Sequence, residues 1–341
     1  MIRITMFSSA DKVAGQGVGS AYSELINLLR KYHAKELEVK INQYYKTDIS
    51  HYHTINPTFF LSTFFKKRFG RRIGYVHFLP STLKGSIHLP SWIESLFYSY
   101  IVTFYKRMDH LVVVNPSFIE ELTNYGIVTE NISYIPNFVS KEKFYPIEAE
   151  KMKKKRDSLD IPENKFVVLG AGQIQERKGV LDFIKLAKEM PEVQFIWLGG
   201  FSFGKITDGY DKFNKLIEQS PENLWFPGII NREDMCSYYN LADVFLLPSF
   251  DELFPMCILE AFSCDKPVIL RDLALYLPIL EGYYEPASDR KEMKKIIRKM
   301  MSSSDYYQDL VQKSIAGSKI YSEERLAKIW LDFYRQQAKI R

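Results

Sequence analysis

Short apolar runs along the chain alternate with stretches in which apolar residues recur every three or four positions. The short runs predict strands, and the periodic stretches predict amphipathic helices. The predicted strands span residues 2–7, 37–41, 73–76, 111–114, 132–135, 166–169, 193–198, 224–226, 244–247 and 267–270. The predicted helices span residues 20–33, 180–189, 232–240 and 323–339. This alternation is typical of βαβ units and predicts an α/β protein with two Rossmann-like domains.

The division between the domains is expected in a polar stretch at residues 140–165. This stretch carries a run of cations, Lys151, Lys153, Lys154, Lys155 and Arg156, which predicts a solvated linker helix. We therefore expect an N-terminal domain at residues 1–145 and a C-terminal domain at residues 146–320. The last segment, residues 321–341, is expected to form a helix that packs back on the N-terminal domain.

Composition excludes several classes of protein. The cysteines are Cys236, Cys257 and Cys264, and they form neither a CxxC pair nor a zinc pattern with histidine, so we expect a reduced cytoplasmic setting and no metal site. The N-terminus turns polar after residue 7, which predicts a first strand and no signal peptide. Residues 89–108 contain Glu94 and Lys106 and do not supply the roughly 20 apolar residues of a spanning helix. No nucleic-acid partner and no cofactor are expected.

The positive charge lies in the N-terminal half. The formal net charge is +5, and residues 1–145 hold 17 Lys and Arg against 11 Asp and Glu, or +6. An aromatic and basic block at residues 59–72 contains the cations Lys66, Lys67, Arg68, Arg71 and Arg72. Two interpretations are open: the block docks on anionic lipid headgroups, or it is a helix with buried phenylalanines and a solvated cationic face.

A glycine loop follows the first predicted strand at Gly15, Gly17 and Gly19. Glycines allow backbone N–H groups to approach a diphosphate, and the helix that follows points its partly positive end at it. Ser20 interrupts the GxGxxG spacing, so a plain tight turn is the alternative.

A second loop, residues 170–179, contains Gly172 and the adjacent cations Arg177 and Lys178 at a predicted helix start. A helix N-terminus favours anions, so two cations there indicate that an anion is brought in to meet them. A diphosphate fits this arrangement, and the alternative is two surface cations in an exposed turn.

A third loop follows the strand at residues 244–247 and carries Glu252 and Glu260. Ligands of open α/β sheets bind beyond the carboxyl ends of the strands, where two carboxylates can accept hydrogen bonds from sugar hydroxyls. Glu252 is expected in the loop and Glu260 about one and a half turns into a helix, so they can serve different parts of one ligand. The alternative is that Glu252 only caps the helix.

Together these features resemble the retaining family 4 glycosyltransferases of the GT-B fold. The resemblance rests on the glycine loop, on His77 after a strand, on Ile135-Pro136-Asn137, on Arg177-Lys178-Gly179 and on Glu252-x7-Glu260. It covers residues 1 to about 270 and implies two Rossmann-like domains facing across a cleft, with the nucleotide sugar held mainly by the second domain.

The resemblance also implies a role for each matching residue. Arg177 and Lys178 would neutralise the departing diphosphate, and Gly17 would approach it through its backbone N–H. Glu260 would accept hydrogen bonds from the ribose. Glu252 and His77 would contact the transferred hexose, which further donor-binding residues would help to hold. These are Gly172, Phe254, Met256 and Cys257.

The implied reaction retains the anomeric configuration and needs no metal, and the chain agrees in having no Asp-x-Asp sequence. The chain departs from the family pattern at Gln173, where arginine is common, and at Pro255, where glycine is usual. Pro255 removes one backbone donor from the sugar-contacting loop. These departures weaken any inference about which hexose is bound.

The acceptor is suggested by residues 74–86, 7–11 and 253–256. These segments look most like bacterial enzymes that add a second hexose to a glucosyl-diacylglycerol and so make membrane glycolipids and lipoteichoic acid anchors. The expected substrates are UDP-glucose or UDP-galactose and monoglucosyl-diacylglycerol, with the protein peripheral on the inner face of the plasma membrane. A capsule or cell-wall polysaccharide transferase and a catalytically silent binding partner are the alternatives.

Overall fold

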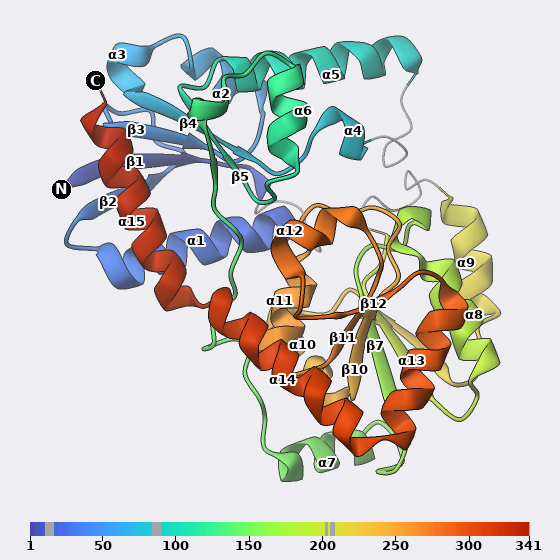
Figure 1. The fold of residues 1–341 in the computed structure, drawn as a ribbon. Coiled ribbons are helices and arrows are strands. Elements are labelled where there is room, and N and C mark those ends of the chain that lie inside the picture. The colour runs from blue at the N-terminus through green and yellow to red at the C-terminus, as the bar shows by residue number, and fades with distance from the viewer. Residues whose placement is uncertain (11–16, 84–89, 202–203, 205–208, 341) are drawn as a thin grey trace. The chain divides into compact units, whose positions relative to one another are not determined.

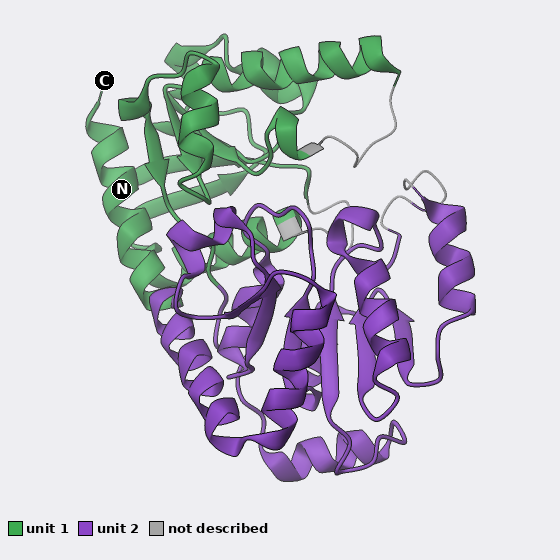
Figure 2. Cartoon of the chain, turned by 45° about the vertical axis from the view of Figure 1, so that its right-hand side comes forward, with its two compact units in different colours: residues 1–138, 323–341 green, residues 139–322 purple. Residues whose placement is uncertain are grey.

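The computed structural model describes residues 1–340 apart from 11–16, 84–89, 202–203 and 205–208. The chain divides into two compact units (Figure 2). Unit 1 consists of Met1–Phe138 together with Glu323–Arg341, and unit 2 is Val139–Ser322.

Unit 1 is built on a parallel six-stranded sheet with the order β2-β1-β3-β4-β5-β6. The strands are β1 (Ile2–Phe7), β2 (Leu37–Ile41), β3 (Ile49–Tyr52), β4 (Arg71–Val76), β5 (His110–Val113) and β6 (Ile132–Tyr134). Five of them lie where the apolar runs predict strands. β3 was not predicted, because its sequence ISHY carries a serine and a histidine although all four residues are buried between β1 and β4.

Helices surround the sheet of unit 1 (Figure 1). They are α1 (Gly17–His33), α2 (Pro57–Ser62), α3 (Lys66–Phe69), α4 (Pro80–Leu83), α5 (Ser91–Lys106), α6 (Phe118–Asn124), the 3-10 turn η2 (Thr129–Asn131) and α15 (Glu323–Lys339). In the part of the chain that the structure describes, no helix has both the length and the apolar character needed to cross a membrane.

The C-terminal helix α15 belongs to unit 1, as predicted. It runs beside α1 (Figure 1), where Lys31 forms an ion pair with Glu323 at 3.3 Å. The hydroxyl of Tyr334 lies 2.7 Å from His51 Nδ1 of the central strand β3. The last helix of the chain is therefore part of unit 1, together with residues 1–138.

Unit 2 has a second parallel six-stranded sheet, with the order β12-β11-β10-β7-β8-β9. Its strands are β7 (Val167–Ala171), β8 (Gln194–Leu198), β9 (Leu224–Gly228), β10 (Val244–Leu247), β11 (Val268–Arg271) and β12 (Glu285–Ala287). Its helices are α7 (Ala149–Asp157), η3 (Glu176–Lys178), α8 (Val180–Glu189), α9 (Tyr210–Glu218), α10 (Arg232–Leu241), α11 (Met256–Ser263), η5 (Ala274–Tyr276), α12 (Leu277–Leu280), α13 (Arg290–Ser302) and α14 (Ser304–Ile320).

The core of unit 2 is aromatic beneath β7 and β8. The ring of Phe183 on α8 meets the rings of Phe195 and Trp197 edge-on, at centroid distances of 5.3 and 5.1 Å. A Cβ on Gly170 would lie 2.5 Å from the Trp197 ring, so glycine in β7 lets this ring pack close to the strand. The predicted linker helix corresponds to α7, which has no buried residue, as its run of lysines indicated.

The boundaries between the units differ from the predicted ones. Unit 2 begins at Val139 rather than at residue 146, because Phe144 is fully buried and stacks edge-on against Tyr239 at 5.8 Å. Unit 1 resumes at Glu323 rather than at residue 321, because the Tyr321 hydroxyl donates a hydrogen bond to the Ile279 carbonyl of unit 2.

Candidate functional site

The loop after β7 places Lys178 at the carboxyl end of the sheet of unit 2. The indole N–H of Trp197 donates to the Gly172 carbonyl at 3.1 Å, which ties the start of this loop to β8. Its end is fixed by Gly179, whose φ is +69° and whose Cβ would lie 2.1 Å from the Pro248 carbonyl oxygen. Only glycine allows this approach, which holds the turn of η3 against the end of β10.

Lys178 and Glu252 meet at this edge. Lys178 Nζ forms an ion pair with Glu252, and the Ser249 hydroxyl donates to the same carboxylate oxygen at 2.7 Å. Both charged side chains are buried. Burial alone would raise the pKa of Glu252, but the positive charges of Lys178 and Arg177 outweigh it, so the pKa lies below its usual value. Two residues separated by 74 positions therefore form one fixed pair of opposite charges.

Arg177 lies half-buried beside this pair. Its Nε donates to Gln175 at 3.1 Å, and its backbone carbonyl accepts from the Phe250 N–H at 2.7 Å. The structure thus brings together Arg177, Lys178 and Glu252. The alternative of two surface cations in an exposed turn does not hold for Lys178, which is 8% exposed.

Glu252 does not cap the helix that follows it. Helix α11 begins at Met256, its N-cap residue is Pro255, and no side chain makes a capping hydrogen bond. The alternative interpretation of Glu252 as a cap is therefore wrong. The backbone N–H groups of Met256 and Cys257 belong to the first turn of α11, where a helix offers no acceptor for them. Phe254 is buried, with its ring 5.3 Å from that of Tyr321.

Two residues of helix α10 donate hydrogen bonds to the Glu260 carboxylate, one to each oxygen. Arg232 donates to Oε1 and the Tyr239 hydroxyl donates to Oε2, each at 2.7 Å. The carboxylate is buried, so these two donors compensate for the water it has lost. Sequence reasoning found Glu260 but missed Arg232 and Tyr239, whose positions seven residues apart put them on one face of α10.

His77 in unit 1 directly follows β4 and is buried. Its Nε2 lies 3.3 Å from Nδ1 of His53, and burial lowers the pKa of His77 to about 3. Burial also lowers the pKa of His53 well below its ordinary value, and the nearby His51 and His77 add to this. The candidate sugar-contacting histidine is therefore a neutral imidazole whose ring is positioned by a second neutral imidazole.

The glycine loop is described only in part. Gly15 lies outside the described residues, and Gly17 is the first residue of α1. A Cβ on Gly19 would lie 2.7 Å from the Ala10 carbonyl oxygen, so the first turn of α1 lies in close contact with the backbone of Ala10. The role predicted for Gly17 stays a prediction.

The predicted docking block divides into two groups. Lys66, Lys67 and Arg68 are exposed, together with Phe64 and Phe65, whereas Phe59 and Phe69 are buried. Arg71 and Arg72 are the first residues of β4. Arg72 binds Asp109 through two nitrogens at 2.8 and 3.0 Å, and Arg71 Nε donates to Gln337 at 2.5 Å. Partners are not confined to these two arginines, because the exposed Lys66 pairs with Asp109 at 3.0 Å and Arg68 Nε donates to the Tyr44 carbonyl at 2.7 Å. Exposure is what distinguishes the groups: Arg71 and Arg72 are half-buried, so the exposed Lys66, Lys67 and Arg68 are the better candidates for docking.

Within the described ranges, no group of three or more His, Cys, Asp or Glu side chains could hold a metal ion. The three cysteines are free thiols.

Family models match both units. A model described as "Glycosyltransferase Family 4" matches residues 18–143, and one described as "Glycosyl transferases group 1" matches residues 151–316. The chain is also 52% identical over 337 residues, or 99% of its length and 90% of the relative's, to the alpha-galactosylglucosyldiacylglycerol synthase of Streptococcus pneumoniae (strain ATCC BAA-255 / R6). The chain therefore belongs to the group 1 and family 4 glycosyltransferases.

More distant relatives agree with this assignment. The processive diacylglycerol alpha-glucosyltransferase of Acholeplasma laidlawii is 27% identical over 241 residues, which cover 70% of this chain and 69% of that protein. Among solved structures, Anabaena Alr3699/HepE in complex with UDP and glucose superposes with a TM-score of 0.79 at 16% identity, covering 98% of this chain and 100% of that one. The predicted GT-B class of fold, with two parallel Rossmann-like sheets, is confirmed.

Proposed function

We propose that this protein transfers a hexose from UDP-glucose or UDP-galactose to monoglucosyl-diacylglycerol and forms an α-linked diglycosyl-diacylglycerol. The observation that carries this proposal is the 52% identity, over 99% of the chain, to a relative named as an alpha-galactosylglucosyldiacylglycerol synthase. A UDP-sugar as the donor substrate is supported by the fixed charges of unit 2, which suit a diphosphate.

Lys178 and Arg177 are the groups that would meet the diphosphate. As the bond from the sugar to the diphosphate breaks, negative charge grows on the leaving oxygen. Cations already held in place by Glu252 and by Gln175 need no reorganisation at that moment. They would stabilise the transition state more than the bound substrate, which is what raises the rate. We therefore propose a reaction that uses no metal, and the expected result is unchanged turnover in excess EDTA.

Glu252 would serve the hexose and Glu260 the ribose. Glu252 keeps an acceptor oxygen beyond the one shared by Lys178 and Ser249. Glu260 has both oxygens occupied, but each carboxylate oxygen has two lone pairs, so a ribose hydroxyl could add to Arg232 and Tyr239. The neutral His77 would offer the sugar a hydrogen bond without adding a positive charge. We propose retention of the anomeric configuration, which agrees with the α linkage in the relative's name.

The exposed group Phe64, Phe65, Lys66, Lys67 and Arg68 supports peripheral binding to an anionic leaflet. Aromatic side chains enter the headgroup boundary, and each nearby cation contributes about 1 kcal/mol of attraction to an anionic surface. We place the protein on the inner face of the membrane, where UDP-sugars and anionic headgroups would meet.

A polysaccharide transferase remains the second candidate, because it would use the same donor residues. Its support is a 24% identity to a Campylobacter jejuni transferase named for a diphospho-undecaprenol acceptor. The experiment that decides is incubation with a panel of nucleotide sugars and either monoglucosyl-diacylglycerol or a polyprenyl-diphosphate sugar, followed by mass spectrometry of the lipids. A mass gain of one hexose on the glycerolipid supports the proposal, and a gain only on the polyprenyl acceptor refutes it. No transfer and no UDP release with any donor would support a catalytically silent protein.

A further inference from the structure

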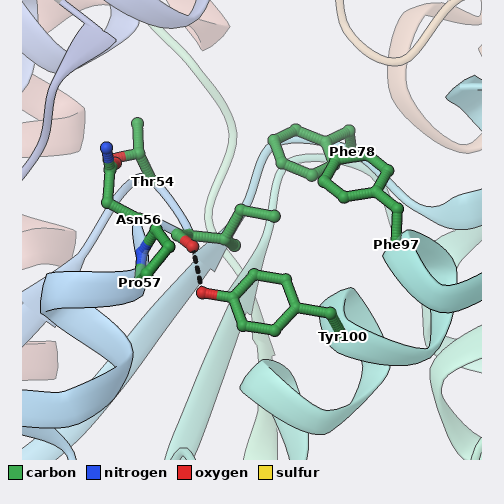
Figure 3. Close-up of a pocket in the computed structure, with 7 residues that line it drawn as sticks. Thr54, Asn56, Pro57, Phe78, Phe97 and Tyr100 are labelled. Carbon is green, nitrogen blue, oxygen red and sulfur yellow. Dashed lines mark hydrogen bonds between the residues drawn. The ribbon is translucent and has the colours of Figure 1, made fainter. Parts of the chain in front are cut away.

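A cavity of about 440 Å³ lies in unit 1 at the carboxyl ends of β3 and β4, where helix α5 passes over them (Figure 3). Its volume falls within the usual range for small-molecule pockets, about 300–1,000 Å³. The lining residues are Thr54, Ile55, Asn56, Pro57, Phe78, Phe97 and Tyr100.

The wall of this cavity is mostly hydrocarbon and aromatic. The Tyr100 hydroxyl donates to the Ile55 carbonyl at 2.5 Å (Figure 3), and the Thr54 hydroxyl donates to the Asn56 side-chain oxygen at 2.7 Å. The amide nitrogen of Asn56 has no hydrogen-bond partner among the described residues, so it is available as a donor. A sugar would need many polar partners here, whereas a hydrocarbon chain with an ester carbonyl needs an apolar wall and a donor.

One end of the cavity adjoins the histidine pair. Thr54 and Phe78 directly follow His53 and His77, whose ring nitrogens lie 3.3 Å apart. One end of a ligand in this cavity would therefore lie near His77, the candidate sugar-contacting histidine.

Apolar side chains also continue from the cavity to the surface. On α5, Tyr100 is preceded at four-residue intervals by Leu96 and Trp92, which are 63% and 67% exposed. From the other side, the Phe60 ring lies 5.4 Å from Tyr100 and 5.6 Å from the exposed Phe64. The guanidinium of Arg107 sits 3.6 Å above the Phe64 ring, so a cation stands at this apolar rim.

We propose that this cavity binds the glycerol ester and the first acyl carbons of the lipid acceptor. The inference rests on the proposed function and adds the residues that select a lipid. The ester end meets Asn56, the acyl chain follows the α5 side toward the exposed rim, and the sugar end lies toward His77. An open cavity whose apolar wall continues to exposed apolar side chains suits a substrate that stays partly in the membrane.

The test compares two phenylalanine substitutions in mixed detergent micelles. Phe97→Ala removes a half-buried ring from the cavity wall, and Phe65→Ala removes an exposed ring from the candidate docking group. We expect Phe97→Ala to raise KM for dioleoyl monoglucosyl-diacylglycerol about tenfold and to leave vesicle binding unchanged. Phe65→Ala should weaken vesicle binding. The control for KM is Tyr45→Ala, which removes a 66% exposed ring of unit 1 that neither lines the cavity nor belongs to the docking group, and which should leave KM in micelles within twofold. An unchanged KM in Phe97→Ala overturns the proposal.

A second measurement uses the unaltered protein and does not depend on how variants fold. Short water-soluble acceptors with two, four and six acyl carbons are compared below their critical micelle concentrations. We expect kcat/KM to rise several-fold with each added pair of carbons, because each buried CH₂ contributes up to about 0.8 kcal/mol. Equal values across the series refute the cavity as a lipid site. Failure of the whole proposed function is distinguishable, since then no acceptor of any chain length gains a hexose.

Discussion

The two units hold their candidate binding residues in opposite chemical environments. In unit 2, Lys178 and Glu252 are buried as a charged pair, and Glu260 is fixed by Arg232 and Tyr239. In unit 1, His53 and His77 are buried without charge, next to an apolar cavity. Fixed charge suits the half that would stabilise a leaving diphosphate. Neutral and apolar groups suit the half that would hold a lipid-linked sugar.

The largest expected effect comes from removing the cation of unit 2. Lys178→Ala should lower kcat about a thousandfold, because the diphosphate loses a preorganised charge at the moment it leaves. It also leaves Glu252 buried without its ion-pair partner, which should raise the pKa of that carboxyl. UDP release measured at saturating donor gives kcat.

The matched control is Lys185→Ala, which removes an exposed lysine from the adjacent helix α8. Its turnover should equal that of the unaltered protein. If Lys178→Ala retained more than a tenth of the turnover, the assignment of the diphosphate to this cation would be wrong.

The next effect concerns the carboxylate that would bind the ribose. Glu260→Gln removes the negative charge while preserving the size of the side chain. We expect UDP affinity, measured by calorimetry, to fall by about 2 kcal/mol, the range of one or two hydrogen bonds to a charged group. Glu222→Gln, an exposed position in the same unit, is the control. Equal UDP affinity in the two variants would place the ribose elsewhere.

Much of the fold follows from the sequence because apolar runs were present where strands are buried. The bounds of β1, β2 and β10 coincide with the predicted runs. β3 was missed because its side chains find polar partners: Ser50 donates to the Phe69 carbonyl at 2.5 Å, and His51 meets Tyr334 of α15. β12 was missed because it is a three-residue edge strand, Glu285–Ala287, with a proline at its centre.

The candidate site was predictable to the extent that its residues lie close in sequence or follow predicted strands. Arg177, Lys178 and Glu252 were found in this way. Arg232 and Tyr239 were not, because their contact with Glu260 depends on how α10 packs against α11. The charge run could not separate Arg72 from Lys67, because Arg72 binds Asp109, a residue 37 positions further along the chain and just before β5.

The buried, neutral histidines of unit 1 predict how stability responds to acid. In the unfolded chain histidine takes up a proton near pH 6.5, whereas burial lowers the pKa of His51 and of His77 to about 3 in the folded chain. The pKa of His53 is also well below 6.5. The unfolded state therefore binds more protons below pH 6.5, and stability falls as the pH falls through the range from 6.5 to 3.

When the pH is lowered from 6.5 to 5, each of these histidines should lower the free energy of unfolding by about 2 kcal/mol. The pKa of Glu252 is lowered from 4.5, so the stability it contributes is lost only below that pH, outside this window. Urea unfolding at pH 6.5 and at pH 5 measures the difference. His51→Gln should show a smaller difference than the unaltered protein, and an equal one would mean that His51 is protonated in the folded state.

The smallest expected effect is on membrane binding, and it distinguishes exposed cations of the docking block from cations that are bound to other side chains at the start of β4. Lys67→Gln removes an exposed charge beside Phe65, and it should weaken binding to vesicles containing anionic lipid about fivefold, the effect of about 1 kcal/mol. Arg72→Gln removes the same charge from a side chain that is bound to Asp109, so it should lower the melting temperature and leave vesicle binding unchanged. The difference between the variants should shrink as salt rises from 0.05 to about 0.5 M, because exposed charges are screened. Equal losses of vesicle binding would mean that the lipid contact extends to β4, and the apolar rim would then be only part of a wider docking surface.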